Sequence, residues 1–155
     1  MLFVFTPPYQ KDILNCICME NCLDANMVAV EDANLKCCEK VLFFLNIEKR
    51  FLNPSYSLWE MSRDIGVPVR KITTAINSVL GQNFLELLNR LRVKEAQKIL
   101  LEAQKNNTYI CIEDVYIQSG FGCRSAFYLC FKKYVGVSPR QYIKMNEIKN
   151  HNSNI

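Results

Sequence analysis

The feature that most constrains this chain is an internal repeat. The segments SLWEMSRDIGVPVRKITTAINSVLG (57–81) and CIEDVYIQSGFGCRSAFYLCFKKYVG (111–136) follow one plan. Each has a short apolar-periodic stretch, a glycine (Gly66 or Gly120), a longer apolar-periodic stretch and a closing glycine. Such self-similarity predicts two copies of one supersecondary unit. A short helix, a glycine turn and a second helix form the helix-turn-helix plan, in which the second helix is presented to a DNA major groove.

The spacing of apolar residues predicts an all-α fold of about seven helices. Apolar residues recur at helical period, and glycine and proline fall between the periodic segments. The longest segment, 84–103, lies between the repeats and is expected to be a linker helix. The helices are expected over 41–51, 58–65, 68–80, 84–103 and 112–119, over the stretch closed by Gly136, and over 139–146. The predicted units are an N-terminal helical or irregular segment (1–40), a first subdomain (41–83), the linker helix, a second subdomain (108–146) and a disordered tail (147–155).

Charge and hydropathy favour a cytoplasmic protein with a polyanionic partner. No apolar run reaches the roughly 18 residues that a membrane helix needs, and the opening MLFVFTPPYQ lacks the basic start of a signal peptide. Residues 1–40 carry a net charge of −3, and residues 41–155 carry +7. A basic body is typical of a protein that binds nucleic acid, although an ordinary solvated surface explains the charge about as well.

The cysteines and the single histidine are the residues to consider for metal binding, redox sensing and catalysis. Eight cysteines are present, and Cys16, Cys18, Cys22, Cys37 and Cys38 could hold a metal or sense thiol redox state. Their spacing does not match the paired arrangement of common zinc sites, so we expect no metal and no cofactor. The only histidine, His151, lies near the C-terminus, and no carboxylate pair or phosphate-binding glycine loop is evident. We therefore expect no enzymatic activity.

Helical spacing divides the second helix of each repeat into two faces. The residues expected to face the core include Ile72 and Ile76 in the first repeat and Phe127 and Phe131 in the second. Phe121 is expected to fill the space behind the glycine turn. Arginine and asparagine can reach guanine and adenine edges, and threonine can contact a thymine methyl. The outward residues are Val69, Arg70, Lys71, Thr73, Thr74 and Asn77 in the first repeat, and Arg124, Ser125, Tyr128, Leu129, Lys132 and Lys133 in the second.

The motif SGFGCRSAFYLCFKKYVGVSPRQYI resembles the signature of the AraC/XylS (arabinose-regulator) family of bacterial transcription regulators. Supporting motifs are Ile76-Asn77, Gly81-Gln82-Asn83-Phe84, Asn89 and Arg92-Val93. The resemblance covers about residues 41–144, which is the DNA-binding domain of that family. It implies that two recognition helices enter successive major grooves, spaced by one turn of about 34–36 Å.

The resemblance also implies roles for individual residues. The base-facing positions would be Arg70, Thr73 and Thr74, with Lys71 nearby, and Arg124, Ser125, Tyr128 and Leu129. Phosphate contacts are expected at Lys132, Lys133 and Arg140. The chain would act at promoters in the bacterial nucleoid, with RNA polymerase as a partner and activation as the expected direction.

Several residues depart from the family pattern. Ser62 and Tyr116 stand where the family usually has alanine, at the close crossing of the two helices. Overpacking at such a crossing costs about 1–3 kcal/mol unless neighbours repack. Cys123 replaces a capping serine, and Leu129 replaces a polar or basic residue. These changes predict that the second subdomain reads bases loosely or mainly holds the DNA backbone.

The sequence thus predicts a double-stranded-DNA-binding transcription regulator. The alternative is a degenerate helix-turn-helix module that binds a partner protein and little DNA. Most members of the family carry a further domain for sensing or dimerisation, and residues 1–40 are too few to form one. A stand-alone regulator and a shortened form of a larger one are both consistent with the sequence.

Overall fold

The computed structural model describes residues 25–106 and 108–152, and these form helices without any strand. The all-α prediction is therefore confirmed. The helical character expected within residues 1–24 lies outside the described residues. The elements are α2 (Ala25–Glu48), the 3₁₀ helix η1 (Arg50–Leu52), α3 (Leu58–Ile65), α4 (Val69–Leu80), α5 (Phe84–Lys105), α6 (Ile112–Gln118), α7 (Arg124–Val135) and α8 (Pro139–Asn152).

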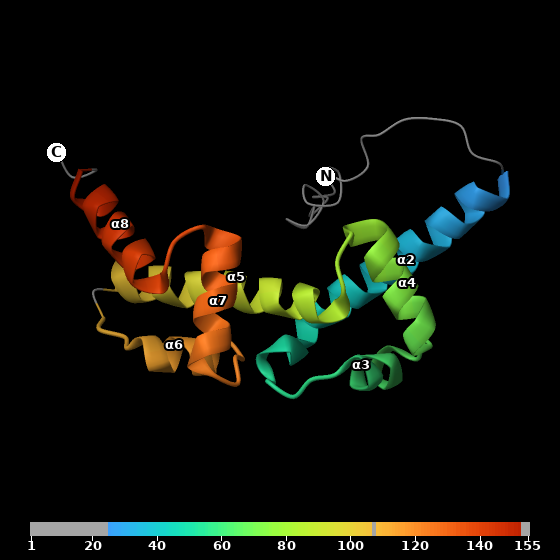
Figure 1. Ribbon diagram of the computed structural model, residues 1–155, viewed down its shortest axis with the longest axis horizontal. Coiled ribbons are helices and arrows are strands. Elements are labelled where there is room, and N and C mark those ends of the chain that lie inside the picture. The colour runs from blue at the N-terminus through green and yellow to red at the C-terminus, as the bar shows by residue number, and fades with distance from the viewer. Residues whose placement is uncertain (1–24, 107, 153–155) are drawn as a thin grey trace, which may run out of the picture.

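The linker helix α5 belongs to two cores. Its first half contributes Leu87, Leu88 and Leu91 to a core with α2, α3 and α4. Its second half contributes Ala96 and Leu100 to a core with α6 and α7. Figure 1 shows α5 running through the middle of the molecule, with α2, α3 and α4 at one end and α6, α7 and α8 at the other. The expected pair of helix-turn-helix subdomains on one linker helix is present.

Capping boxes set where α3 and α5 begin. The Ser57 hydroxyl accepts from the backbone N–H of Glu60, and the Glu60 carboxylate accepts from the backbone N–H of Ser57. Asn83 and Glu86 make the same exchange at the start of α5. Each box satisfies two of the N–H groups that a helix start leaves unpaired. These ends are therefore encoded locally.

The first helix differs from the sequence prediction. It was expected over 41–51, but α2 begins at Ala25 and ends at Glu48. Lys49 ends it by adopting a left-handed conformation, with φ 47°. Cys37 and Cys38 lie in the same core as the later part of the helix. Within residues 31–40 the buried side chains are those of Cys37 and Cys38, so this part of the helix shows no stripe of large apolar residues in the sequence.

The last helix also extends beyond its expected end. It was expected over 139–146, but α8 continues to Asn152. Its start agrees with the expectation, because Pro139 is buried at the first helical position, where a missing N–H costs nothing.

Candidate nucleic-acid interface

The two helices of the first unit are joined by the short turn Gly66-Val67-Pro68. Gly66 ends α3 in the left-handed conformation, with φ 66°. The Ser62 hydroxyl donates to the carbonyl of Val67 over 2.7 Å. Serine is therefore accommodated where the two helices cross, and its hydroxyl adds a hydrogen bond within the turn.

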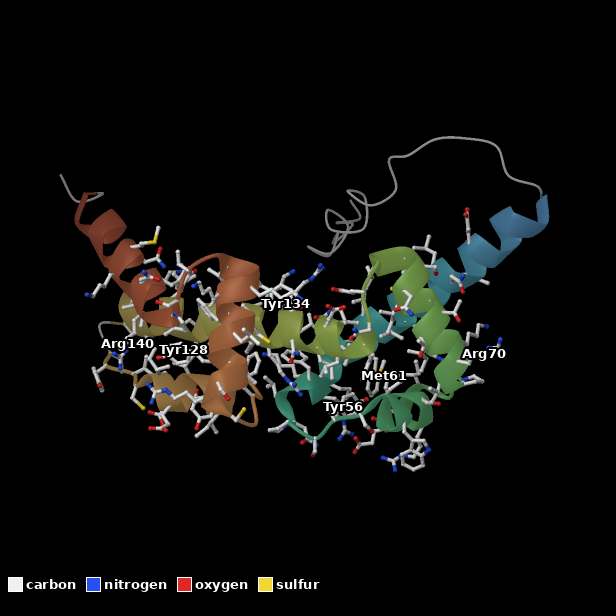
Figure 2. All side chains as sticks on the ribbon, viewed as in Figure 1. Tyr56, Met61, Arg70, Tyr128, Tyr134 and Arg140 are labelled. Carbon is white, nitrogen blue, oxygen red and sulfur yellow. The ribbon has the colours of Figure 1, made fainter. Side chains whose placement is uncertain are left out.

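The outer face of α4 carries the residues expected to read DNA. Arg70, Lys71, Thr74 and Asn77 are exposed, and Figure 2 shows Arg70 at the N-terminal end of α4, pointing away from the core. Thr73 is half-buried, and its hydroxyl donates to the carbonyl of Val69 over 3.0 Å. Thr73 thus has its methyl group and an acceptor lone pair left for a ligand, but not its proton. Ile72, Ala75 and Ile76 form the buried face.

The two helices of the second unit are joined by a turn at Gly120, and Phe121 packs behind this turn. Phe121 is 3% exposed, and its ring meets Phe127 edge-on at 5.4 Å between centroids. The expectation that Phe121 fills this space is therefore confirmed. Phe127 and Phe131 are fully buried, as the inward stripe predicted. α7 is consequently held by an aromatic core.

The outer face of α7 combines a stacked cation with an exposed leucine. Arg124 and Ser125 are exposed at the N-terminal end of the helix. The guanidinium of Arg124 lies 5.4 Å from the ring centroid of half-buried Tyr128, within cation–π range. Leu129 is 74% exposed. This face therefore offers one ordered arginine, one hydroxyl and an apolar contact surface.

A cleft beside α7 brings together two of the predicted arginines. Arg124, at the start of α7, and Arg140, in the first turn of α8, line a cavity of about 320 Å³ with Tyr109. Glu113 also lines it, so the cleft carries a net positive charge from these residues. Tyr109 is 91% exposed and was not selected from the sequence, because an isolated tyrosine in a loop has no periodic signal. Figure 2 shows Tyr128 and Arg140 at this end of the molecule.

The two predicted lysines at the end of α7 have different surroundings. Lys132 is exposed near the C-terminal end of the helix. The Lys133 ammonium pairs with the carboxylate of Glu86 on α5, over 3.2 Å. The hydrogen bond to Glu86 raises the pKa of Lys133, and the backbone N–H of Asn83, followed by Lys133, lowers the pKa of Glu86. Lys133 therefore has a partner within the protein, and of the two lysines Lys132 is the more available for the expected phosphate contact.

Tyr116 and Cys123, which depart from the expected family pattern, differ in how the structure accommodates them. Tyr116 is half-buried and lies 6.3 Å from the ring centroid of Phe127, so the bulky side chain has been absorbed into the aromatic core. Cys123 precedes α7 and makes no side-chain capping bond. Its thiol lies 3.4 Å from the hydroxyl of Ser125, and this hydrogen bond lowers the pKa of Cys123. α7 therefore begins without the side-chain capping bond that a serine would supply.

The described residues contain no group of three or more His, Cys, Asp or Glu side chains that could hold a metal ion. Cys37 and Cys38 are buried, and burial raises the pKa of Cys38 to about 12, so it is a neutral core thiol. The other proposed sensor cysteines, Cys16, Cys18 and Cys22, lie outside the described residues. Within the part of the chain that the structure covers, no helix has the length and apolar character to cross a membrane.

Comparisons with known proteins agree with this geometry. A family model described as a helix-turn-helix domain matches residues 61–145. The melibiose operon regulatory protein of Escherichia coli (strain K12) is 32% identical over 69 residues, which are 44% of this chain and 21% of that protein. The chain thus matches about a fifth of the length of this curated relative.

Two solved structures share the arrangement of helices. A protein of unknown function from Listeria innocua superposes with a TM-score of 0.58 and 25% identity, covering 69% of this chain and 94% of that one. The C-terminal domain of AraT, a response regulator from Geobacillus stearothermophilus, gives a TM-score of 0.54 and 25% identity, covering 75% and 84%.

Proposed function

Because the chain belongs to the AraC-type family of helix-turn-helix DNA-binding domains, we propose that it binds specific double-stranded DNA sequences through both α4 and α7. The observation that carries this proposal is the presence of one exposed helix face with basic residues, on α4 and on α7, in each of the two subdomains that α5 joins. α5 has 22 residues and so is about 33 Å long at 1.5 Å per residue. Major grooves on one face of DNA repeat every ~34–36 Å, a length similar to that of α5.

The two recognition helices contribute unequally to the proposed reading of bases. On α4, the polar side chains Arg70, Thr74 and Asn77 are all exposed. Arginine and asparagine make bidentate contacts with guanine and adenine, each worth about 1–3 kcal/mol of discrimination. On α7, Arg124 and Ser125 are the polar candidates, beside the apolar Leu129. We therefore expect α4 to read its element more strictly than α7.

The DNA backbone is proposed to lie along the cationic groups beside α7. Lys132 and Arg140 are both exposed, and Arg140 shares a cleft with Arg124. Such contacts fix the register of the protein on the duplex without reading sequence. The downstream role is regulation of transcription in the bacterial nucleoid, with activation through RNA polymerase as the proposed direction.

A second candidate function is binding of a protein partner with little DNA affinity. The observation that favours it is the exposure of large apolar side chains: Trp59 is 64% exposed and Leu129 is 74% exposed. The two candidates differ in salt dependence. DNA binding weakens steeply with salt because each phosphate contact releases counterions, whereas an apolar protein interface responds little.

Selection of sites from a random duplex library near physiological salt tests the leading proposal. We expect an asymmetric motif of two short elements about one helical turn apart. Arg70→Ala should then lower the affinity for the selected site by about 1–3 kcal/mol and relax preference at one base pair. Lys36→Ala, which removes one positive charge from α2, is the matched control and should leave base preference unchanged. If no sequence is enriched, the protein-binding function is favoured instead.

A further inference from the structure

The two subdomains touch each other directly, in addition to sharing α5. The contact is made by the turn at Gly120 in the second subdomain and by the backbone of Phe51, Leu52 and Asn53 in the first. Arg92, from the middle of α5, lies within it. We call this set of five residues the joint.

Arg92 ties the joint together through its guanidinium. The side chain is 5% exposed. Its Nε donates to the carbonyl of Phe51 over 2.7 Å, and a terminal nitrogen donates to the carbonyl of Asn53 over 3.0 Å. On the other side, its Cζ lies 5.9 Å from the ring centroid of Phe121, which belongs to the second core. One buried cation therefore contacts both subdomains.

Gly120 lies in close contact with the backbone of the first subdomain. A Cβ at this position would lie 2.6 Å from the Cα of Leu52 and 2.7 Å from the carbonyl oxygens of Leu52 and Phe51. The equivalent glycine of the first repeat, Gly66, has nothing within 4 Å of its Cβ position. Both have positive φ. The turn alone therefore accounts for a glycine at 66, whereas at 120 the contact between subdomains also requires one.

Two further contacts join α5 to α7 and to Lys49, the residue that follows α2. The ammonium of Lys133 pairs with Glu86 over 3.2 Å, and that of Lys49 pairs with Glu95 over 3.1 Å. Each exposed pair is weak by itself. Together with the buried contacts of Arg92, however, they restrain rotation of each subdomain about the linker helix.

We infer that the joint sets the spacing and rotation between the two DNA elements that α4 and α7 read, with Arg92 as a positioning residue. The inference rests on the proposed function. One base pair added between the elements separates them by about 3.4 Å and turns one relative to the other by about 35°. A hydrogen bond does not survive a displacement of this size, and neither does the contact at Gly120. With these contacts intact, the protein therefore fits only one spacing between the two DNA elements.

The test compares spacing preference in matched variants of the full chain. Duplexes carrying the selected site, with one or two base pairs inserted or removed between its elements, are titrated by fluorescence anisotropy. The wild type should lose about tenfold in affinity, equivalent to ~1.4 kcal/mol, for a change of one base pair. Arg92→Met should bind the optimal duplex more weakly and vary by less than about threefold across the series. Lys98→Met, at an exposed position of the same helix, should follow the wild type.

The possible outcomes separate this inference from the proposed function. If the wild type enriches no sequence, the proposed function fails first. If it binds its selected site but tolerates every spacing, the inference is overturned and the function stands. A spacing curve for Arg92→Met as sharp as that of the wild type also overturns it.

A second measurement covers the case in which Arg92→Met does not fold. Residual dipolar couplings of the free protein report the relative orientation of the subdomains without DNA. The wild type should fit one alignment tensor across both, and Gly120→Ala should require two. Gly66→Ala, which strains a turn without crowding the joint, should keep one tensor. A single tensor in Gly120→Ala, together with an unchanged spacing curve, would refute the role of the joint.

Discussion

Gly120→Ala should destabilise the protein much more than Gly66→Ala, although both replace the turn glycine of a helix-turn-helix unit. At Gly66, φ is 66° and the new methyl group would meet nothing within 4 Å. The cost there is the left-handed conformation of an alanine, about 1–2 kcal/mol. Part of that cost is offset because alanine has less conformational freedom in the unfolded chain, by about 0.4–1 kcal/mol. The expected net loss for Gly66→Ala is therefore about 1 kcal/mol.

At Gly120 the same conformational cost applies, since φ is 85°, but a steric cost is added. The new Cβ would lie 2.6 Å from the Cα of Leu52, whereas carbon atoms pack best at about 3.5–4.0 Å. The contacting atoms are backbone, so no side chain can rotate away. Relief requires a shift of roughly 1 Å between the turn and η1, which would strain the bonds from Arg92 to the carbonyls of Phe51 and Asn53. Overpacking adds about 1–3 kcal/mol.

Urea denaturation followed by circular dichroism, with both variants and the wild type at one pH, measures the difference. We expect Gly120→Ala to lose about 2–4 kcal/mol and Gly66→Ala about 1 kcal/mol. Equal losses, within about 0.5 kcal/mol, would show that the close approach at Gly120 is not a feature of the folded protein. The joint would then not hold the two subdomains in the proposed way.

Three other outcomes follow from particular surroundings. Burial raises the pKa of Cys38 from 9.0 to about 12, so the stability that the neutral thiol contributes is complete below pH 9 and is lost as the pH rises from 9 toward 12. The free energy of unfolding of the wild type, from urea denaturation, should fall with a slope of up to ~1.4 kcal/mol per pH unit in that window, and Cys38→Ala should flatten the fall; parallel curves would contradict this. Lys132→Ala should reduce the salt slope of DNA binding by about 1, and Lys133→Ala by less because of its internal pair; equal slopes from titrations between 50 and 200 mM salt would show that both lysines face DNA alike. Tyr116→Ala should lower stability in thermal unfolding by about 1–3 kcal/mol because its half-buried ring packs on the second core, whereas an increase would reveal that the tyrosine is strained.

The faces of the two recognition helices were predictable from sequence, because helical period alone places residues on one side or the other. Ile72, Ile76, Phe127 and Phe131 are buried as expected. The exposure of Arg70 likewise follows from its position in the period of one helix. This period does not determine which residue of another helix an exposed side chain contacts. The pairing of Lys133 with Glu86 crosses 47 residues, so no local pattern could separate it from Lys132.

What the sequence by itself determined is the repeat, and with it the all-α plan of two helix-turn-helix units on a long helix. These follow from period, capping boxes and turn glycines, which act within a few residues of the chain. Only the tertiary structure decided how the two units are held relative to each other. Arg92 could be recognised in a motif, but its acceptors, the carbonyls of Phe51 and Asn53, lie 41 and 39 residues away. Gly66 and Gly120 occupy equivalent places in the repeat, and only packing distinguishes an open turn from one pressed against a second backbone. Contacts between backbone atoms distant in sequence leave no pattern in the side chains, and for that reason the joint could be found only in the folded molecule.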